Sequence, residues 1–236
     1  FCVSAGNCIE PIDLGVNHND FRAQADDERI SSFLKAASQN LSSRRLISPA
    51  ESLNSLTIGA LHADDFGEYP ANGREDILPS NEIFSPISRL GYGFRKSLKP
   101  EIFLPGGRQL YSPPMLDRDT IYHINKVTAL GPGQRVASDG SKQGELSSTA
   151  FTKGSSNAAA LATRAGINIY DMLVRLREDE NEEIPDDLIC VVIKALLVHG
   201  ARHPENAKKS LVESLKNNSN SRRIKEVISR YTGYGT

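Results

Sequence analysis

The sequence predicts an α/β fold, a mostly parallel sheet flanked by helices, and two observations lead to this prediction. In the first half of the chain, short β-prone runs end at glycine, proline or polar residues and are separated by polar loops. After Gly154 the character changes, because long stretches with few helix breakers carry apolar residues at helical spacing. Helices that follow buried strands cover the sheet, as in a layered α/β domain.

The expected core strands lie in the first half of the chain. The first of them ends at Gly6-Asn7, so it delivers a polar residue at its carboxyl end. This is the edge of an α/β sheet at which sites are built. In chain order, the expected strands are Phe1 to Ala5, Leu46-Ile47, Leu53 to Leu61, Glu101 to Leu104 and Thr120 to Val127.

Helical spacing marks several further segments. Ala23 to Gln39 is expected to form a helix within a loop, and Ala158 to Leu176 a long core helix. Another helix follows Pro185 and ends at His199-Gly200, and more polar helices are expected at 206–215 and 222–230. The apolar residues that predict the first two helices are Ile30, Phe33, Leu34 and Ala37, and then Leu161, Ala165, Ile169, Met172, Leu173 and Leu176.

Composition excludes several classes of function. The 28 Lys and Arg residues nearly balance the 29 Asp and Glu residues, so no overall field favours nucleic acid or a membrane surface. No apolar run is long enough to span a membrane. The cysteines, Cys2, Cys8 and Cys190, are odd in number and lack metal-ligand spacing, which argues against a disulfide framework or a zinc site. The chain starts at Phe1 within an expected strand, so we expect upstream residues to be missing; the cytoplasm is slightly favoured over secretion.

Ser156 is the candidate nucleophile. It follows the glycine turn at Gly154 and begins a helix rich in small residues. A serine in the first helical turn has its hydroxyl near unpaired backbone N–H groups and the positive end of the helix dipole, which suits a nucleophilic oxygen. The same pattern is also that of an ordinary serine N-cap followed by an alanine-rich packing face. From this stretch alone, both interpretations stay open.

Four segments in order along the chain resemble the subtilisin-like serine proteases, the subtilases. Each segment is weak evidence alone, but together they cover most of the chain up to the helix after Ser156. The family's Ala-Ala-Gly-Asn segment resembles Ser4-Ala5-Gly6-Asn7, and its Pro-Ala and Val-Ile-x-Val-Gly-Ala segment resembles Ser48-Pro49-Ala50 with Leu56-Thr57-Ile58-Gly59-Ala60. Its Lys-Pro-Asp-Ile-x-Ala-Pro-Gly segment resembles Leu98-Lys99-Pro100-Glu101-Ile102-Phe103-Leu104-Pro105-Gly106. Its Gly-Thr-Ser-x-Ala motif around the nucleophile resembles Gly154-Ser155-Ser156-Asn157-Ala158-Ala159.

The resemblance implies a serine endopeptidase of subtilisin-like fold. Ser156 would be the nucleophile and Asn7 the oxyanion-hole amide, while Ser4, Ala5 and Gly6 would line the primary specificity pocket. Residues 1–236 would be the C-terminal part of the catalytic domain, with insertions at 11–45 and 107–150. The family's catalytic Asp and His precede the Asn segment, so this part alone is expected to be inactive. The expected partners are a polypeptide substrate and the N-terminal half of the same domain, and no cofactor is expected.

The sequence departs from the family at two positions near the nucleophile. Ser155 stands for the usual Thr, and Ala160 for the usual Pro. Two alternatives to a protease also remain: a non-catalytic subtilase-like binding or regulatory module, and another α/β hydrolase pairing Ser156 with a local histidine such as His123. The second lacks the G-x-S-x-G pattern.

The other histidines are interpreted as structural, and no metal site is expected. His199-Gly200-Ala201 imitates the family's His-Gly-Thr motif but closes an apolar helix, and His62 and His123 are expected to be structural or exposed. His199 and His203 have helical ligand spacing, but Gly200 and Pro204 argue against one continuous helix. The acidic stretch Glu178 to Glu183 is expected to be a solvated loop.

Overall fold

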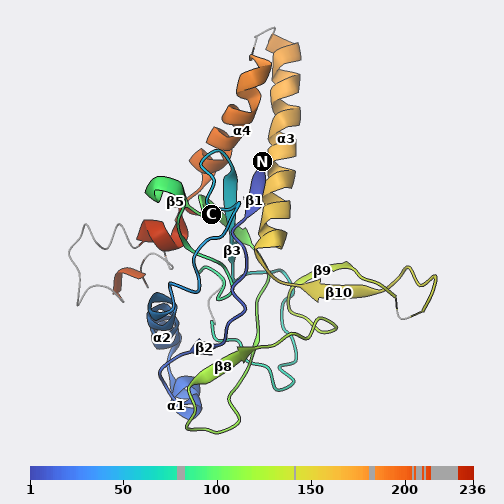
Figure 1. Ribbon diagram of the computed structural model, residues 1–236. Coiled ribbons are helices and arrows are strands. Elements are labelled where there is room, and N and C mark those ends of the chain that lie inside the picture. Colours follow the sequence, from blue (N-terminus) through green and yellow to red (C-terminus); the bar gives the residue numbers. More distant parts are fainter. Residues whose placement is uncertain are drawn as a thin grey trace.

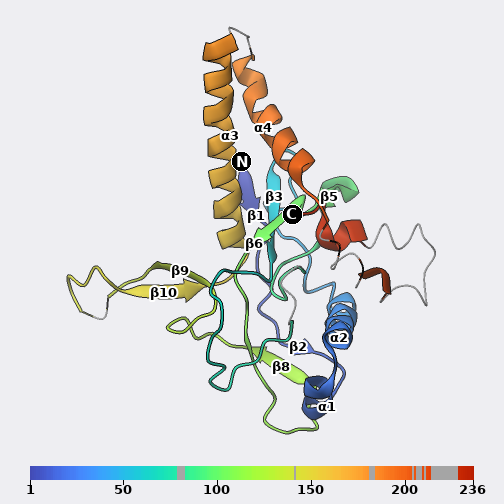
Figure 2. The same cartoon turned by 180° about the vertical axis from the view of Figure 1, so that it is seen from behind.

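A computed structural model of the chain describes residues 1–236 except 79–82, 141, 181–183, 204, 206–208, 210 and 214–227 (Figures 1 and 2). At its centre lies a parallel three-stranded sheet in the order β1-β3-β6. These strands are β1 (Cys2–Ser4), β3 (Leu56–Leu61) and β6 (Ile102–Pro105), and each corresponds to an expected strand. The α/β fold with a parallel core sheet is therefore confirmed.

One face of this sheet is covered by α3 (Ser155–Glu180). Leu56, Ile58 and Ala60 alternate along β3 and share a core with Ala158 and Ala162 of the helix. The small alanine side chains let the helix approach the strands closely. The opposite face of β3 carries Gly59, where a Cβ atom would lie 2.2 Å from the Phe103 ring. The sheet can thus accept a helix on one face and an aromatic ring on the other.

The second long helix, α4 (Asp186–Gly200), lies beside α3, and both extend beyond the sheet (Figure 1). A charged network around Glu101 attaches α4 to the sheet. Glu101 Oε2 accepts hydrogen bonds from Lys99 Nζ at 2.8 Å and from the Thr57 amide at 2.6 Å, and Oε1 pairs with Lys194 Nζ of α4 at 2.8 Å. The Lys-Pro-Glu segment therefore joins the sheet to α4.

The expected stripe of α3 is only partly buried. Leu173 is buried, but Met172 and Leu176 are 51% and 44% exposed, so the interpretation of the whole stripe as core was wrong for these two residues. They lie in the C-terminal half of α3, and α4 packs beside this helix. Further exposed apolar residues on the two helices are Ile167, Tyr170, Leu188, Val191 and Leu196.

A second core lies at the other end of the molecule, under α1 (His18–Ala23) and α2 (Asp26–Gln39). The helix expected at Ala23 to Gln39 is largely α2, and its four predicting apolar residues are buried. These helices pack against an antiparallel sheet in the order β2-β8-β7, whose strands are β2 (Ile12–Asp13), β8 (Ile121–Ile124) and β7 (Tyr111–Ser112). The strand expected at Thr120 to Val127 is β8.

Three parts of the fold differ from expectation. Glu178 to Glu180, expected within a solvated loop, are the last residues of α3, and 181–183 lie outside the described residues. Leu46-Ile47 lies outside the named strands, because the nearby pairing is an isolated bridge between Arg45 and Leu90. A hairpin of β9 (Gln134–Ala137) and β10 (Thr149–Thr152) occupies a region with no expected strand, since its Gly- and Ser-rich tip hides the alternation of the arms. The remaining elements are β4 (Gly91–Tyr92), the 3₁₀ turn η1 (Phe94–Lys96) and β5 (Leu98–Lys99).

The helices expected at 206–215 and 222–230 fall mostly outside the described residues, although residues 228–232 are helical. Among the described helices, none has both the length and the apolar character needed to cross a membrane.

Candidate active site

The site forms where β1 ends beside the start of α3. After β1 the chain turns at Gly6, whose φ of +89° favours glycine. Asn7 follows as an exposed residue and makes an isolated antiparallel bridge with Ser88. Strand β1 therefore places Asn7 at the carboxyl end of the parallel sheet.

The turn before α3 is closed by Gly154. Its φ is +143°, and its N–H donates to the Gly106 carbonyl at 2.8 Å. A Cβ atom on Gly154 would lie 2.6 Å from Nδ2 of Asn7. Glycine is required here on both grounds, because the backbone conformation and the close approach of Asn7 each exclude a side chain.

Ser155 fixes the orientation of the Asn7 side chain. The Ser155 backbone N–H donates to Asn7 Oδ1 at 3.0 Å, and the Ser155 hydroxyl donates to the same oxygen at 3.1 Å. The hydroxyl oxygen in turn accepts the Gly6 N–H at 3.0 Å. A backbone N–H can only donate, so the atom facing it must be the amide oxygen. The Nδ2 group of Asn7 is left free of protein acceptors among the described residues.

Ser156 occupies the first turn of α3 and is exposed, whereas Ser155 is buried. The first backbone N–H groups of a helix have no partner within the helix, and the dipole makes this end positive. Asn157 holds the turn in shape, since its Nδ2 donates to the Thr152 carbonyl at 3.0 Å. An exposed hydroxyl, a free amide donor on Asn7 and the backbone N–H of Ser156 therefore lie at the start of α3.

The three expected pocket residues have different surroundings. Ala5 is fully buried and its N–H donates to the Ile58 carbonyl at 2.8 Å, so its side chain belongs to the core. Ser4 and Gly6 are partly exposed. If a substrate lies along this strand end, it meets Ser4 and Gly6 and not the Ala5 side chain.

No histidine activates Ser156 in the described part of the chain, where the Ser156 hydroxyl makes no hydrogen bond. His62 is fully buried and its Nε2 lies 2.7 Å from Asp76 Oδ1. His123 is an exposed residue of β8, and His199 is in the last turn of α4. His62 is thus structural, in agreement with one of the two interpretations from sequence.

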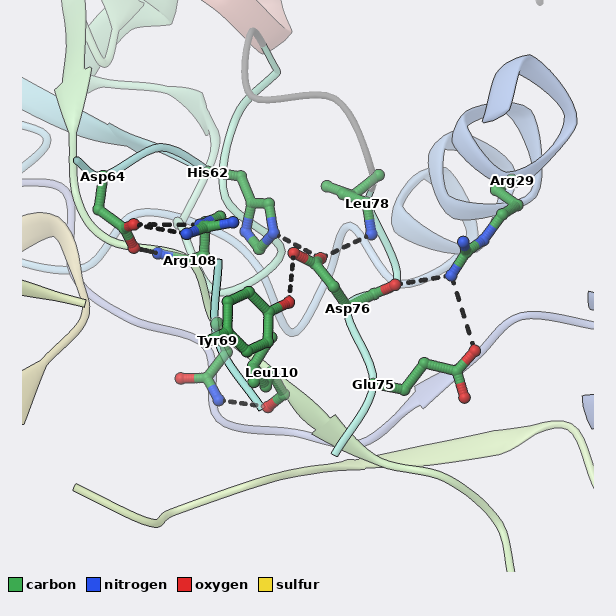
Figure 3. Close-up of polar contacts among 10 residues, drawn as sticks. Arg29, His62, Asp64, Tyr69, Glu75, Asp76, Leu78, Arg108 and Leu110 are labelled. Carbon is green, nitrogen blue, oxygen red and sulfur yellow. Dashed lines mark hydrogen bonds and ion pairs between the residues drawn. The ribbon is translucent and has the colours of Figure 1, made fainter. Parts of the chain in front are cut away.

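The His62–Asp76 pair belongs to a set of charged side chains that the sequence did not reveal, shown in Figure 3. We call this set the lower polar cluster. Asp76 accepts hydrogen bonds from the Leu78 N–H at 3.0 Å and the Tyr69 hydroxyl at 3.3 Å. Its members are Arg29, His62, Asp64, Tyr69, Glu75, Asp76 and Arg108.

Two pKa values in the lower polar cluster are shifted. Burial acts to raise the pKa of Asp76, but the charge and hydrogen bond of His62 and the Leu78 N–H outweigh burial and lower it. Burial, together with the charge of Asp76, raises the pKa of Tyr69 to about 12. Tyr69 therefore stays a neutral donor to an ionised Asp76.

The lower polar cluster is connected through the backbone to the turn before α3. Gly106 and Gly107 donate to the carbonyls of Leu61 at 3.1 Å and Ala63 at 2.9 Å. The next residue, Arg108, donates its backbone N–H to Asp64 Oδ2 at 2.8 Å and its Nε to Oδ1 at 3.0 Å. Gly106 is also the residue whose carbonyl accepts the Gly154 N–H. The Asp64–Arg108 pair thus supports the segment on which the turn before α3 rests.

Within the described ranges of the chain, no group of three or more His, Cys, Asp or Glu side chains is arranged to hold a metal ion. The arrangement of the site is instead that of a hydroxyl beside hydrogen-bond donors. Such donors stabilise an oxyanion that forms when a nucleophile attacks a carbonyl.

Comparison with known proteins agrees with this geometry. Residues 1–235 match the Subtilase family, also designated Peptidase S8. No curated protein and no solved structure matches the chain. The family match includes all four motif segments, from Asn7 to the start of α3, and the family's chemistry is that of serine proteases. The chain therefore belongs to the subtilase family.

Proposed function

We propose that Ser156 is the nucleophile of a serine endopeptidase and that Asn7 is a side-chain donor of its oxyanion hole. The observation that carries this proposal is the pair of hydrogen bonds from Ser155 to Asn7 Oδ1, at 3.0 and 3.1 Å. They turn the Nδ2 donor of Asn7 away from Ser155. A carbonyl oxygen at the start of α3 would then meet Nδ2 and the backbone N–H of Ser156.

The chemistry follows from these donors. The Ser156 oxygen attacks the peptide carbonyl while a general base takes its proton, and the carbonyl oxygen gains a negative charge. Collapse of this intermediate breaks the peptide C–N bond, and the protonated base gives its proton to the leaving amine. Water then hydrolyses the acyl ester on Ser156 by the same two steps. Asn7 stabilises the oxyanion in both.

We propose that the general base and its carboxylate partner come from a preceding half of the same domain. Two surfaces support this. Strand β1 pairs only with β3 in the described sheet, so its other edge has free backbone groups. Beside it, a groove between β1, α3 and α4 is lined by apolar side chains, including those of Phe1, Leu56, Ile167, Tyr170 and Val191. A strand and helix from the preceding half would cover both. We also retain 11–45 and 107–150 as proposed insertions.

A fluorophosphonate probe tests the nucleophile. The full-length protein should be labelled, and Ser156→Ala should abolish the labelling because the attacking oxygen is lost. Ser155→Ala is the matched control: it removes the neighbouring hydroxyl and should slow labelling without abolishing it. Equal labelling of Ser156→Ala and wild type would show that another residue is the nucleophile.

The absence of a base near Ser156 among the described residues also favours a second candidate function, a non-catalytic binding or regulatory module. Both candidates predict that residues 1–236 alone show no peptidase turnover, and robust Ser156-dependent hydrolysis by them would refute both an external base and a non-catalytic module. The activity of the full-length protein separates the two candidates. If the full-length protein is folded but neither labels nor cleaves peptides, the binding module is the better assignment.

A further inference from the structure

Arg89 lies against the strand end that carries Asn7. Its Nε donates to the Asn7 backbone carbonyl at 3.2 Å. Its aliphatic stem lies over Gly6, where a Cβ atom would be 3.1 Å from Arg89 Cδ. The Arg89 backbone N–H also donates to the Gly6 carbonyl at 3.0 Å. Main chain and side chain of one residue therefore hold the Gly6-Asn7 turn.

The other end of the Arg89 side chain is fixed to a different segment. Nη1 donates to the Ser43 carbonyl at 2.9 Å and to the Arg45 carbonyl at 2.8 Å. These residues follow α2 and lie at the end of segment 11–45. The guanidinium thus bridges this segment and Asn7, which are far apart in sequence.

The chemistry of the bridge indicates a geometric role. All three acceptors of the Arg89 side chain are backbone carbonyls, and in the described part of the chain Arg89 pairs with no carboxylate. Arginine presents its donors in a rigid planar fork, so it fixes the relative positions of the groups that it binds. Gly6, with its φ of +89°, precedes Asn7 in a conformation that favours glycine. The Asn7 backbone is held by contacts from the 87–89 segment, which are the Cys8 N–H bond to the Ile87 carbonyl at 2.7 Å and the Arg89 Nε bond to the Asn7 carbonyl.

We propose that Arg89 is a positioning residue for the oxyanion hole, acting through Asn7. This inference rests on the proposed function of Asn7. Ser155 fixes the side-chain amide of Asn7 from one side, and Arg89 fixes its backbone from the other. Without Arg89, the Asn7 amide keeps its contact with Ser155 only part of the time, and its Nδ2 donor is displaced from the oxyanion.

The first test is a double-mutant cycle on peptide cleavage by the full-length protein. Arg89→Gln should lower kcat by about tenfold, a part of the roughly 10²–10³-fold effect of removing an oxyanion donor, and leave KM within about twofold. In an Asn7→Ala background, Arg89→Gln should lower kcat no further, because the Asn7 side chain that Arg89 positions is gone.

Arg89→Lys, which keeps the charge and one donor group, should recover part of the loss of kcat. Multiplicative losses in the double variant, or an unchanged kcat in Arg89→Gln, would overturn the proposal.

The second test does not require turnover. The Ser155 amide, which donates to Asn7 Oδ1, should exchange its hydrogen at least about tenfold faster in Arg89→Gln than in wild type. Arg95→Gln is the matched control, since Arg95 is an exposed arginine of η1 with no contact to Asn7 or Ser155 in the described residues, and it should leave this exchange unchanged. If the wild type shows no peptidase activity but Ser155 exchange responds to Arg89, the proposed function fails and the positioning of Asn7 stands. If Ser155 exchange does not respond in a folded variant, the positioning role is wrong.

Discussion

The turn before α3, which carries the proposed nucleophile, and the lower polar cluster lie at the two ends of one backbone connection, and they are built from opposite kinds of residue. The turn consists of Gly154 and Ser155 against Asn7, with contacts so close that a single Cβ atom would collide. The cluster consists of long charged side chains such as Arg29, Asp76 and Arg108. Small residues leave room for a substrate backbone, whereas paired charges hold loops together. Changes in the turn should therefore alter catalysis, and changes in the cluster should alter stability.

The largest expected effect is that of Asn7→Ala in the full-length protein. Loss of the Nδ2 donor should reduce kcat by about 10²–10³-fold, because the oxyanion loses one of its hydrogen bonds in the transition state. Asn7 Oδ1 also accepts two hydrogen bonds from the buried Ser155, so the variant should lose about 1–2 kcal/mol of stability but remain folded. Peptide kinetics and a melting curve measured together check this separation. A kcat within about threefold of wild type would remove Asn7 from the oxyanion hole.

The reverse result is expected for His62→Ala in the cluster. His62 is fully buried and its Nε2 lies 2.7 Å from Asp76 Oδ1, so truncation leaves a cavity and removes one of the hydrogen-bond partners of the buried carboxylate. The cost should be about 3 kcal/mol of unfolding free energy. Below the melting transition, kcat should stay within about twofold of wild type. A loss of kcat without loss of stability would mean that the cluster takes part in catalysis.

The same contrast explains what could be predicted from sequence. Asn7 and Ser155 are 148 positions apart, yet both sit in short motifs whose order along the chain resembles one family. The core strands were recognisable because β-prone runs end at glycine, proline or polar residues. In the cluster, by contrast, Arg29, His62 and Asp76 have no common period or motif, and only the folding of long loops brings them together. The β9–β10 hairpin was not predicted for a related reason, since its alternating arms are short beside a long Gly- and Ser-rich tip.

A smaller effect on catalysis is expected for Ser155→Ala. The variant loses the hydroxyl that donates to Asn7 Oδ1 and accepts from the Gly6 N–H, but it keeps the backbone N–H that also binds Oδ1. We expect kcat to fall by about tenfold, the equivalent of about 1.4 kcal/mol. Ser155→Thr restores the hydroxyl and should recover most of the rate. If Ser155→Ala and Ser155→Thr are equally slow, the hydroxyl contact does not orient Asn7.

The smallest expected effect is on the stability of the protein at acidic pH. The pKa of Asp76 is lowered in the folded state: burial opposes this shift, but His62 and the hydrogen bonds to the carboxylate prevail. A group with a lowered folded pKa stabilises the protein above its unfolded pKa, near 3.9 for Asp, and this contribution is lost as the pH falls through the folded value. Asp76→Asn should therefore cost about 1 kcal/mol at pH 7 and progressively less below about pH 4. Because Asn does not titrate between pH 7 and pH 3, the stabilities of the wild type and Asp76→Asn should converge as the pH falls.

Urea unfolding of both proteins between pH 7 and pH 3 measures this directly, with Asp171→Asn on the exposed face of α3 as the control. A difference in unfolding free energy that stays constant from pH 7 to pH 3 would mean that the charge of Asp76 does not contribute to stability, and that its hydrogen bonds alone hold the lower polar cluster together.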